Sequence, residues 1–404
     1  MSVLLSAYAC EPGKGSEPGV GWNWACTLAE LGHEVHLITR SNNRFVIARE
    51  LARLGVPITA SYCDLPPWAI WWKRHGSGIY IYYLLWQVQA YLHARRLLKR
   101  RSFDRAHHVT FASFRQPTFM WGLGIPLLFG PVGGGETMPA ALRRGLPWMG
   151  RLREKLRDIG NAAVKFDPLM HLTFSRAVRI ACTTEETLHR IPQRYRHKCI
   201  VQPTIGVEAV ADQCADSNPL RPPSFLYIGR LLYWKGIHLI LRALAVVKLH
   251  APEVTLKIIG DGPDSGWLRK VANECGVHSI VHWAPWMAHD VILKEYRSHT
   301  AFLFPSMHDS GGMVVLEALS AGCPVICLKA GGPGSIITPS CGVAISPDNR
   351  SEDEIVHALS DAMLRLIRDP KNRDELASQC VARANEYRWR TIVTRLYPDQ
   401  LPGL

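Results

Sequence analysis

The stretch from Ala301 to Leu328 most constrains what this chain can fold into, because it alternates apolar runs with a polar, glycine-rich loop. One apolar run ends at Pro305, a loop and a helical period follow, and a second apolar run begins at Pro324. This order predicts a strand, a loop, a helix and another strand of an open parallel sheet. Ligands of such sheets bind outside the carboxyl ends of the strands, so we expect the loop to border a binding site.

Two carboxylates stand in this stretch, Asp309 in the loop and Glu317 in the helix. If the helix begins near Gly311, Glu317 lies about two turns along it and both side chains face one site. Carboxylates accept hydrogen bonds from hydroxyls, and the first N–H groups of a helix donate them, so the stretch suits a polyhydroxylated ligand. The alternative is that Asp309 only caps the helix and that Glu317 is solvated.

The whole stretch follows the pattern PSxx(E/D)x7E and then A(L/M)xxGxPV. The residues that match are Pro305, Ser306, Asp309, Glu317, Ala318, Gly322, Pro324 and Val325. This pattern resembles the donor-sugar motif of retaining GT-B glycosyltransferases of family 4. The resemblance implies an α/β protein of two Rossmann-like domains, whose parallel sheets face a deep interdomain cleft. It also implies donor contacts from Gly311, Gly312, Met313 and Val314. Asp309 stands where Glu is commoner, which shortens the reach by one methylene and leaves the donor sugar open.

A second motif opens the C-terminal half, where a strand ends at Gly229 and is followed by Arg230, Lys235 and a long amphipathic helix. Two cations beside the free amides of a helix start form an anion site that suits a diphosphate, unless both are merely solvated. The spacing resembles that of the same family, whose Arg and Lys hold the pyrophosphate of a nucleotide sugar. Gly260 and Gly262 form a further family landmark after the next strand, and with Gly229 they are expected at the donor.

The N-terminus predicts a strand at Val3–Ala9, a glycine-rich loop at Cys10–Gly21, a helix at Trp22–Leu31 and a second strand at Val35–Thr39. Glycines let backbone approach a phosphate or sugar closely, although such a loop is often only a turn. It is neither GxGxxG nor a Walker A sequence. It resembles the first loop of the family's N-terminal domain, which implies that Gly15 and Ser16 lie near the donor phosphates.

Further polar residues follow the next N-terminal strands. The family places a functional His after a (F/Y)D pair, but His107 and His108 are adjacent here and depart from its spacing. We favour His108 over His107 as the catalytic His, with a purely structural His as the alternative. The loop at 130–136 follows another apolar run and is expected on the acceptor side. The predicted acceptor-side residues are Arg115, Gly133, Gly134 and Glu136.

A length of 404 residues predicts two domains. We expect an N-terminal domain at 1–208, joined by a crossover helix at about 388–404, and a donor domain at 209–387, with a proline-rich joint at 211–223. The eleven cysteines include no CxxC pair, which indicates reduced thiols in a cytoplasmic protein. No signal-like start and no apolar stretch of about 18 residues are found.

The formal net charge of +13 calls for an anionic partner. Residues 64–101 are rich in aromatic side chains and end in five basic ones, and residues 143–165 are basic again. Aromatic rings with basic flanks suit an anionic membrane surface, and a buried helix with a solvated basic end is the equal alternative. We expect no nucleic-acid partner, because no RNP-like or KH-like motif is present.

Together these features predict a metal-independent, retaining glycosyltransferase with no cofactor besides its nucleoside diphosphate-sugar substrate. Arg230 and Lys235 offset the departing diphosphate, Asp309 and the neighbouring amides hold the sugar, and Glu317 holds the ribose. We expect a lipid-linked or polysaccharide-precursor glycan as acceptor, at the cytoplasmic face of the cell membrane. The alternatives are a soluble small-molecule acceptor and a catalytically silent relative that binds sugar or nucleic acid. A Rossmann dehydrogenase is disfavoured because GxGxxG is missing. The sequence leaves the nucleotide, the sugar, the acceptor and the oligomeric state open.

Overall fold

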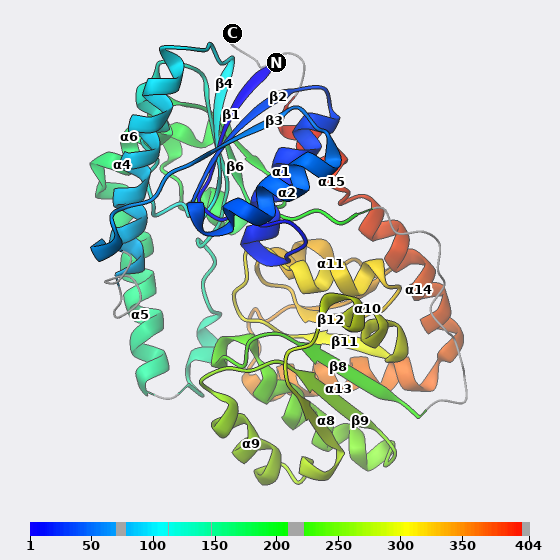
Figure 1. Cartoon of the computed structure of the whole chain (residues 1–404). Helices are drawn as coiled ribbons and strands as arrows, with labels where there is room; N and C mark the ends of the chain where they lie inside the picture. Colours follow the sequence, from blue (N-terminus) through cyan, green and yellow to red (C-terminus); the bar gives the residue numbers. More distant parts are fainter. Residues whose placement is uncertain (70–77, 112, 147, 209–221, 398–404) are drawn as a thin grey trace. The chain divides into compact units, whose positions relative to one another are not determined.

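The computed structural model describes the chain except for residues 70–77, 112, 147, 209–221 and 398–404. It divides into two compact units, each an α/β structure around its own sheet (Figure 1). Unit 1 contains the described residues of Met1–Gly135, Ile159–Gly206 and Trp389–Leu404, and unit 2 those of Glu136–Asp158 and Val207–Arg388. The segment Glu136–Asp158, which we expected in the N-terminal domain, therefore groups with unit 2. Most of the expected joint at 211–223 lies outside the described residues.

The described residues of unit 1 form a seven-stranded parallel sheet with the order β3-β2-β1-β4-β5-β6-β7. Strands of such sheets are covered on both faces and are therefore nearly all apolar. The strands are β1 (Ser2–Ala7), β2 (Glu34–Thr39), β3 (Ile58–Tyr62), β4 (Arg105–Thr110), β5 (Leu127–Val132), β6 (Ala177–Cys182) and β7 (Cys199–Val201).

Helices cover both faces of this sheet (Figure 1). Helices α1 (Ser16–Glu30), α2 (Arg44–Leu54) and α15 (Trp389–Leu396) lie on one face, and α4 (Ile79–Leu98) and α6 (Pro168–Arg176) lie on the other. The short helix α7 (Glu185–Arg190) follows β6. The expected helix start at Trp22 was wrong, because α1 begins six residues earlier, at Ser16. Its first turn tolerates Pro18, whose missing N–H has no partner in a first turn.

Helix α4 buries one face of the aromatic segment and exposes the other. Tyr82, Tyr83 and Trp86 are buried in a core cluster that also contains Tyr8 and Phe129. The opposite face is exposed and apolar, through Ile81, Leu85, Val88 and Leu92. The part of the segment at 70–77 lies outside the described residues.

The described residues of unit 2 form a six-stranded parallel sheet with the order β10-β9-β8-β11-β12-β13. Its strands are β8 (Ser224–Ile228), β9 (Thr255–Ile259), β10 (Val281–Ala284), β11 (Ala301–Phe304), β12 (Val325–Leu328) and β13 (Gly342–Ile345). All residues of the central strands β11 and β12 are buried. The prediction of two Rossmann-like parallel sheets is confirmed.

Helices also pack on both faces of the second sheet (Figure 1). Helices α8 (Ile237–His250), α9 (Ser265–Glu274) and α13 (Glu352–Arg368) lie on one face, and α10 (His289–Ser298) and α11 (Met313–Ser320) on the other. The short helix α12 (Gly331–Ile336) follows β12, and α14 (Pro370–Asn385) packs against α11. Helix α5 (Trp148–Ala163) begins in unit 2 and ends in unit 1.

Candidate functional site

Two loops of unit 2 follow the neighbouring strands β8 and β11. After β8 the chain passes through Gly229 and Arg230 to a short turn at Tyr233–Lys235. Gly236 comes next with a φ of +73°, and a Cβ there would lie 2.1 Å from the carbonyl oxygen of Pro305. Glycine permits this close approach, which brings Lys235 beside the loop that follows β11.

Lys235 and Asp309 form an ion pair between these loops. Their side chains are 17% and 18% exposed. The other carboxylate oxygen of Asp309 accepts the N–H groups of Gly311 and Gly312, each at 3.1 Å. Burial disfavours the ionised form of Asp309, but Lys235 and the two amides outweigh burial and lower its pKa. This carboxylate therefore orients Lys235 and fixes the loop just before α11 at the same time.

Helix α11 begins at Met313, later than the expected start near Gly311. Gly312 is its N-cap residue with a φ of +68°, a conformation that side chains other than glycine rarely adopt. Glu317 therefore lies just past the first turn rather than about two turns along. The amides of Gly311 and Gly312, which we expected to face a ligand, donate to Asp309 in this arrangement.

Glu317 is held by two residues of the neighbouring helix α10. One of its oxygens lies 3.3 Å from Nε2 of His289, and the other accepts the hydroxyl of Tyr296 at 3.4 Å. The side chain of Glu317 is 16% exposed, whereas that of His289 is mostly exposed. The carboxylate of Glu317 is thus held by the ring of His289 and the hydroxyl of Tyr296, and it stays partly accessible to solvent.

Arg230 has an exposed side chain and forms no ion pair with the residues that the structure describes. The loop after β9 lies close to it, because a Cβ on Gly260 would meet the oxygen of Gly229 at 2.1 Å and one on Gly262 would meet that of Leu231 at 2.3 Å. The structure thus brings Lys235 and Asp309 into contact, whereas Arg230 after β8 has no ion-pair partner among the described residues.

The segment 136–158 supports the loop of Asp309 from within unit 2. Glu136 is buried and accepts the hydroxyl of Ser310 at 2.5 Å, so the structure places this expected acceptor-side residue against the Asp309 loop. Glu154 of α5 accepts the hydroxyl of Tyr233 at 2.9 Å and lies 3.1 Å from Nε2 of His308. Tyr233 lies two residues before Lys235 in the sequence, and His308 directly precedes Asp309.

In unit 1, both adjacent histidines of β4 are buried. Nε2 of His108 lies 2.7 Å from the hydroxyl of Tyr83, and Nδ1 lies 3.3 Å from that of Ser6. Burial lowers the pKa of His108 to about 3 and that of His107 to about 4, so both rings are neutral. With both nitrogens of His108 engaged, this geometry favours a structural role over the expected catalytic one.

Glu17, in the first turn of α1, is the group at the carboxyl edge of unit 1 that sequence reasoning missed. Burial raises its pKa to about 7, although a hydrogen bond with the backbone of Phe111 acts in the opposite direction. Phe111 directly follows β4 and has a φ of +54°, which is rare for an aromatic residue. A carboxyl group that changes charge near neutral pH therefore lies where strand β4 ends.

The other residues predicted for unit 1 surround the loops after β4 and β5. Ser113 pairs with Gly133 in a parallel bridge, and Arg115 donates to the amide oxygen of Asn161 at 3.1 Å. A Cβ on Gly134 would lie 3.3 Å from the guanidinium of Arg115. Gly15 is the N-cap residue of α1, and the side chain of Ser16 lies outside the described part of the chain.

The described residues contain no group of three or more His, Cys, Asp or Glu side chains arranged to hold a metal ion. Among the helices of the described residues, none combines the length and the apolar character that crossing a bilayer needs.

Comparison with known proteins finds a family model that is similar to part of unit 2. A model described as glycosyl transferases group 1 matches residues 215–384. This match covers less than half of the chain, so it relates that segment to the group 1 glycosyl transferases. Among curated relatives, a glycogen synthase of Mycobacterium tuberculosis is 29% identical over 192 residues, which cover 47% of this chain and 45% of the relative. The chain thus spans less than half the length of the curated relatives it matches.

Solved structures resemble the whole chain. The apo form of the lipopolysaccharide outer core galactosyltransferase WaaB has a TM-score of 0.63 at 16% identity, covering 99% of this chain and 100% of that one. HepE of Anabaena, in complex with UDP and glucose, has a TM-score of 0.60 at 15% identity, covering 100% and 99%. These likenesses confirm the expected GT-B fold.

Within residues 215–384, the missed residues are His289, which contacts Glu317, and His308, which contacts Glu154. Glu154 itself lies upstream of that segment. Helical spacing identifies Glu154 only as a charged residue on an amphipathic helix. Its role becomes visible once the fold places it against Tyr233 and His308.

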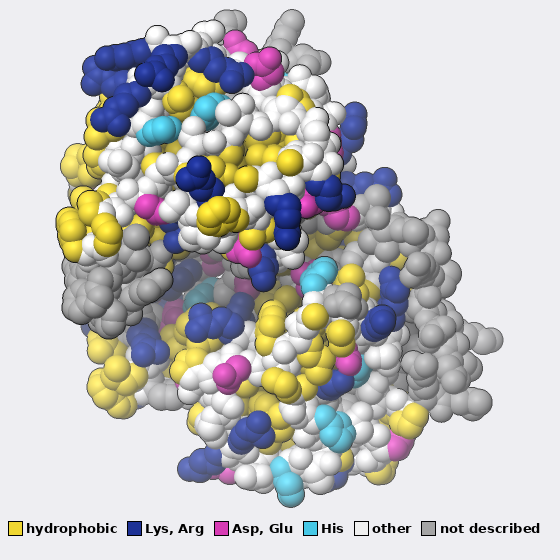
Figure 2. Space-filling view, viewed as in Figure 1, with side chains coloured by type: hydrophobic (Ala, Val, Ile, Leu, Met, Phe, Trp, Pro, Cys, Tyr) yellow, Lys and Arg dark blue, Asp and Glu magenta, His cyan; other side chains and the backbone are white. Residues whose placement is uncertain are grey.

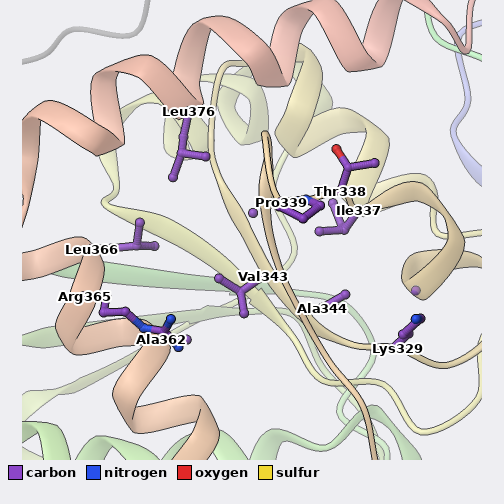
Figure 3. A pocket seen from close by; sticks show the side chains of 12 residues that line it. Lys329, Ile337, Thr338, Pro339, Val343, Ala344, Ala362, Arg365, Leu366 and Leu376 are labelled. Atoms are coloured by element: carbon purple, nitrogen blue, oxygen red, sulfur yellow. The ribbon is translucent and has the colours of Figure 1, made fainter.

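A separate cavity of about 450 Å³ lies at the edge of the second sheet (Figure 3). Strand β13 and helices α13 and α14 line it, largely with apolar side chains such as Val343, Leu366 and Leu376. Lys329 and Arg365 lie at its margin. None of the predicted site residues lines this cavity, so it is distinct from the loops of Lys235 and Asp309.

Proposed function

We propose that this chain is a glycosyltransferase that moves a sugar from a nucleoside diphosphate-sugar to an acceptor. The observation that carries the proposal is the pair of loops after β8 and β11, where Asp309 orients Lys235 and the cation Arg230 remains unpaired within the described residues. Two cations in adjacent loops suit a diphosphate with two charged phosphates. The complex of HepE with UDP and glucose supports a nucleotide-sugar donor.

In this proposal Arg230 and Lys235 stabilise the charge that develops on the departing diphosphate. No metal is required, because these side chains supply the positive charge that a divalent cation would otherwise provide. We also propose that the reaction retains the anomeric configuration and needs no metal. Both properties are implied by the resemblance of the motif between Asp309 and Val325.

The two carboxylates take different parts. Glu317 accepts hydrogen bonds from the hydroxyls of the ribose. These bonds replace the long contacts that His289 and Tyr296 make with its carboxylate. Asp309 positions Lys235, and it also remains the predicted sugar ligand, since each carboxylate oxygen can accept more than one hydrogen bond. Its shorter side chain limits it to ligands that come close to the loop.

We further propose an acceptor at a membrane surface, namely a lipid-linked or polysaccharide-precursor glycan at the cytoplasmic face. The exposed apolar face of α4 supports this, because Ile81, Leu85, Val88 and Leu92 recur at helical spacing and face solvent. The helix ends in basic residues, and dark blue side chains gather over this end in Figure 2. Apolar side chains followed by cations suit the interface of an anionic bilayer.

A panel of UDP-, GDP- and ADP-sugars tests the function. At least one should raise the melting temperature of the wild type and should release its nucleoside diphosphate when an acceptor extract is added. Arg230→Ala should lose both effects, while Arg368→Ala, an exposed arginine of α13, should keep them. Binding without any release would favour the catalytically silent relative, and release with water-soluble acceptors alone would favour the small-molecule alternative. The absence of binding across the panel would contradict the proposal.

A further inference from the structure

Helix α5 presents an apolar stripe to solvent. Its residues recur every three or four positions on one side of the helix, and they are between 43% and 67% exposed. The stripe consists of Trp148, Met149, Leu152, Leu156 and Ile159. Phe166, just after the helix, is 84% exposed and extends the stripe by another turn. Side chains of this size in one continuous row mark an interaction surface rather than scattered exposure.

Cations flank the stripe. Arg151, Arg153 and Lys155 are exposed, and none of them forms an ion pair with a residue that the structure describes. On a helical projection Arg151 and Lys155 fall along one side of the stripe and Arg153 falls along the other. An apolar stripe between two basic margins is the pattern of a helix that lies in the plane of an anionic membrane surface.

We propose that the outer face of α5 docks on an anionic lipid bilayer, with the stripe in the acyl region and the three cations at the headgroups. The inference rests on the proposed function in one respect, that the acceptor is bound to a membrane. The alternative occupant, a second copy of this chain, is disfavoured because antiparallel or parallel pairing of two α5 helices would bring like charges together. The formal net charge of +13 adds attraction to an anionic surface.

The side of α5 opposite the stripe contacts the loops of the candidate site. Glu154 accepts the hydroxyl of Tyr233 and contacts His308, and Gly150 packs beside the ring of Tyr233. Arg157 donates to the backbone oxygen of Glu136, whose carboxylate binds Ser310. Residues 148–158 of α5 belong to the same unit as the loops of Lys235 and Asp309, so a bilayer on their outer face is about one helix thickness from these loops. Docking would present these loops to an acceptor in the interface.

Co-sedimentation with vesicles tests the surface without any substrate, so its outcome does not depend on transfer activity. The wild type should bind vesicles of phosphatidylglycerol and phosphatidylcholine at low salt, and 0.5 M salt should release most of it, since salt screens surface charges. Leu156→Ser with Ile159→Ser should reduce the partition coefficient at least about tenfold. The control is Phe45→Ser with Leu249→Ser, two apolar residues outside the stripe that are more exposed than Leu156 and Ile159. It should bind like the wild type.

A charge variant, Arg151→Glu with Arg153→Glu and Lys155→Glu, should lose binding to anionic vesicles and leave the melting temperature unchanged. Equal binding of the stripe variant, the control and the wild type would overturn the proposal. So would a lipid-free dimer that the stripe variant dissociates, because the surface would then belong to a second copy. Intact vesicle binding together with failed nucleotide binding would instead contradict the proposed function and leave this inference standing.

Discussion

Polar side chains have different environments at the carboxyl edges of the two sheets. In unit 1 the histidines of β4 are buried and neutral, and Nε2 of His108 lies 2.7 Å from the hydroxyl of Tyr83. In unit 2 the loops at the same edge contain the Lys235–Asp309 ion pair and the exposed side chain of Arg230. The difference supports the proposal that unit 2 binds a charged ligand.

Glu17 is the exception in unit 1, because burial brings its pKa to about 7. It can therefore carry or release a proton near neutral pH, where the neighbouring histidines cannot. Under the proposed function, the edge of unit 1 receives neutral hydroxyls and the edge of unit 2 receives phosphates. The following predictions test this contrast, beginning with the largest expected effect.

Removing a cation from unit 2 should be most damaging. Arg230→Ala and Lys235→Ala should each slow transfer at least about tenfold, because charge-assisted hydrogen bonds contribute about 1.5–3 kcal/mol each. Lys235→Ala should also lower the free energy of unfolding by about 3 kcal/mol, since it leaves Asp309 unpaired. Rates of nucleoside diphosphate release and urea titrations measure the two effects. Unchanged turnover in both variants would remove these residues from the mechanism.

The carboxylates should separate nucleotide binding from transfer. Glu317→Gln should weaken binding of the free nucleoside diphosphate about tenfold, the effect of one charge-assisted bond. Asp309→Asn should spare that binding and impair transfer, because Asn keeps an oxygen for the amides of Gly311 and Gly312. Calorimetry compares both variants with Glu274→Gln, an exposed carboxylate of α9. The reverse pattern would mean that the two roles are exchanged.

Because the histidines of β4 are buried and neutral, the free energy of unfolding of unit 1 should decrease at low pH. Their pKa values of about 3 and 4 lie below the ordinary 6.5, so the unfolded chain binds more protons in this window. The stability they contribute is present above pH 6.5 and is lost as the pH falls toward 4, by up to about 1.4 kcal/mol per pH unit for each His. Hydrogen exchange of β4 amides at pH 7 and 5 should show this loss, and His108→Gln should reduce it. An equal slope in wild type and variant would refute the assignment.

The smallest effect should come from Glu17. Its raised pKa means that the neutral form is favoured in the fold, so its contribution is present at low pH and is lost as the pH rises through about 7. Glu17→Gln imitates the neutral form and should leave the melting temperature unchanged at pH 5. At pH 8.5 the variant should melt above the wild type, because only the wild type then carries a charge at this buried position. A variant that melts lower at pH 8.5 would show that the charged form is the stabilised one.

The comparison also shows how far the sequence predicts this molecule. Apolar runs and glycine-rich loops predict both parallel sheets, because strand burial and turn chemistry are local properties. The motif residues Lys235 and Asp309 were predicted from their spacing, and the structure adds that they form an ion pair. The start of α1 was wrong by six residues, since Pro18 and two glycines suggested a loop where the first turn of a helix tolerates them.

Tertiary contacts account for what the sequence did not predict. Nothing near Glu154 in the chain indicates that it contacts His308, 154 residues away. The burial of His108 depends on Tyr83 and Ser6, which come from α4 and β1. Glu136 was predicted as a loop residue of the N-terminal domain, yet it binds Ser310 in unit 2. Such pairings depend on how distant segments pack, which local patterns do not encode.

The central claim, that the loops after β8 and β11 hold a nucleoside diphosphate, is tested most directly by calorimetric titration. The nucleoside diphosphate selected by the panel of sugars is titrated into the wild type, Arg230→Ala and Arg368→Ala. The account predicts one site per chain, affinity at least about tenfold weaker in Arg230→Ala, and wild-type affinity in Arg368→Ala. Equal affinity in all three proteins, or loss in Arg368→Ala alone, would contradict the claim.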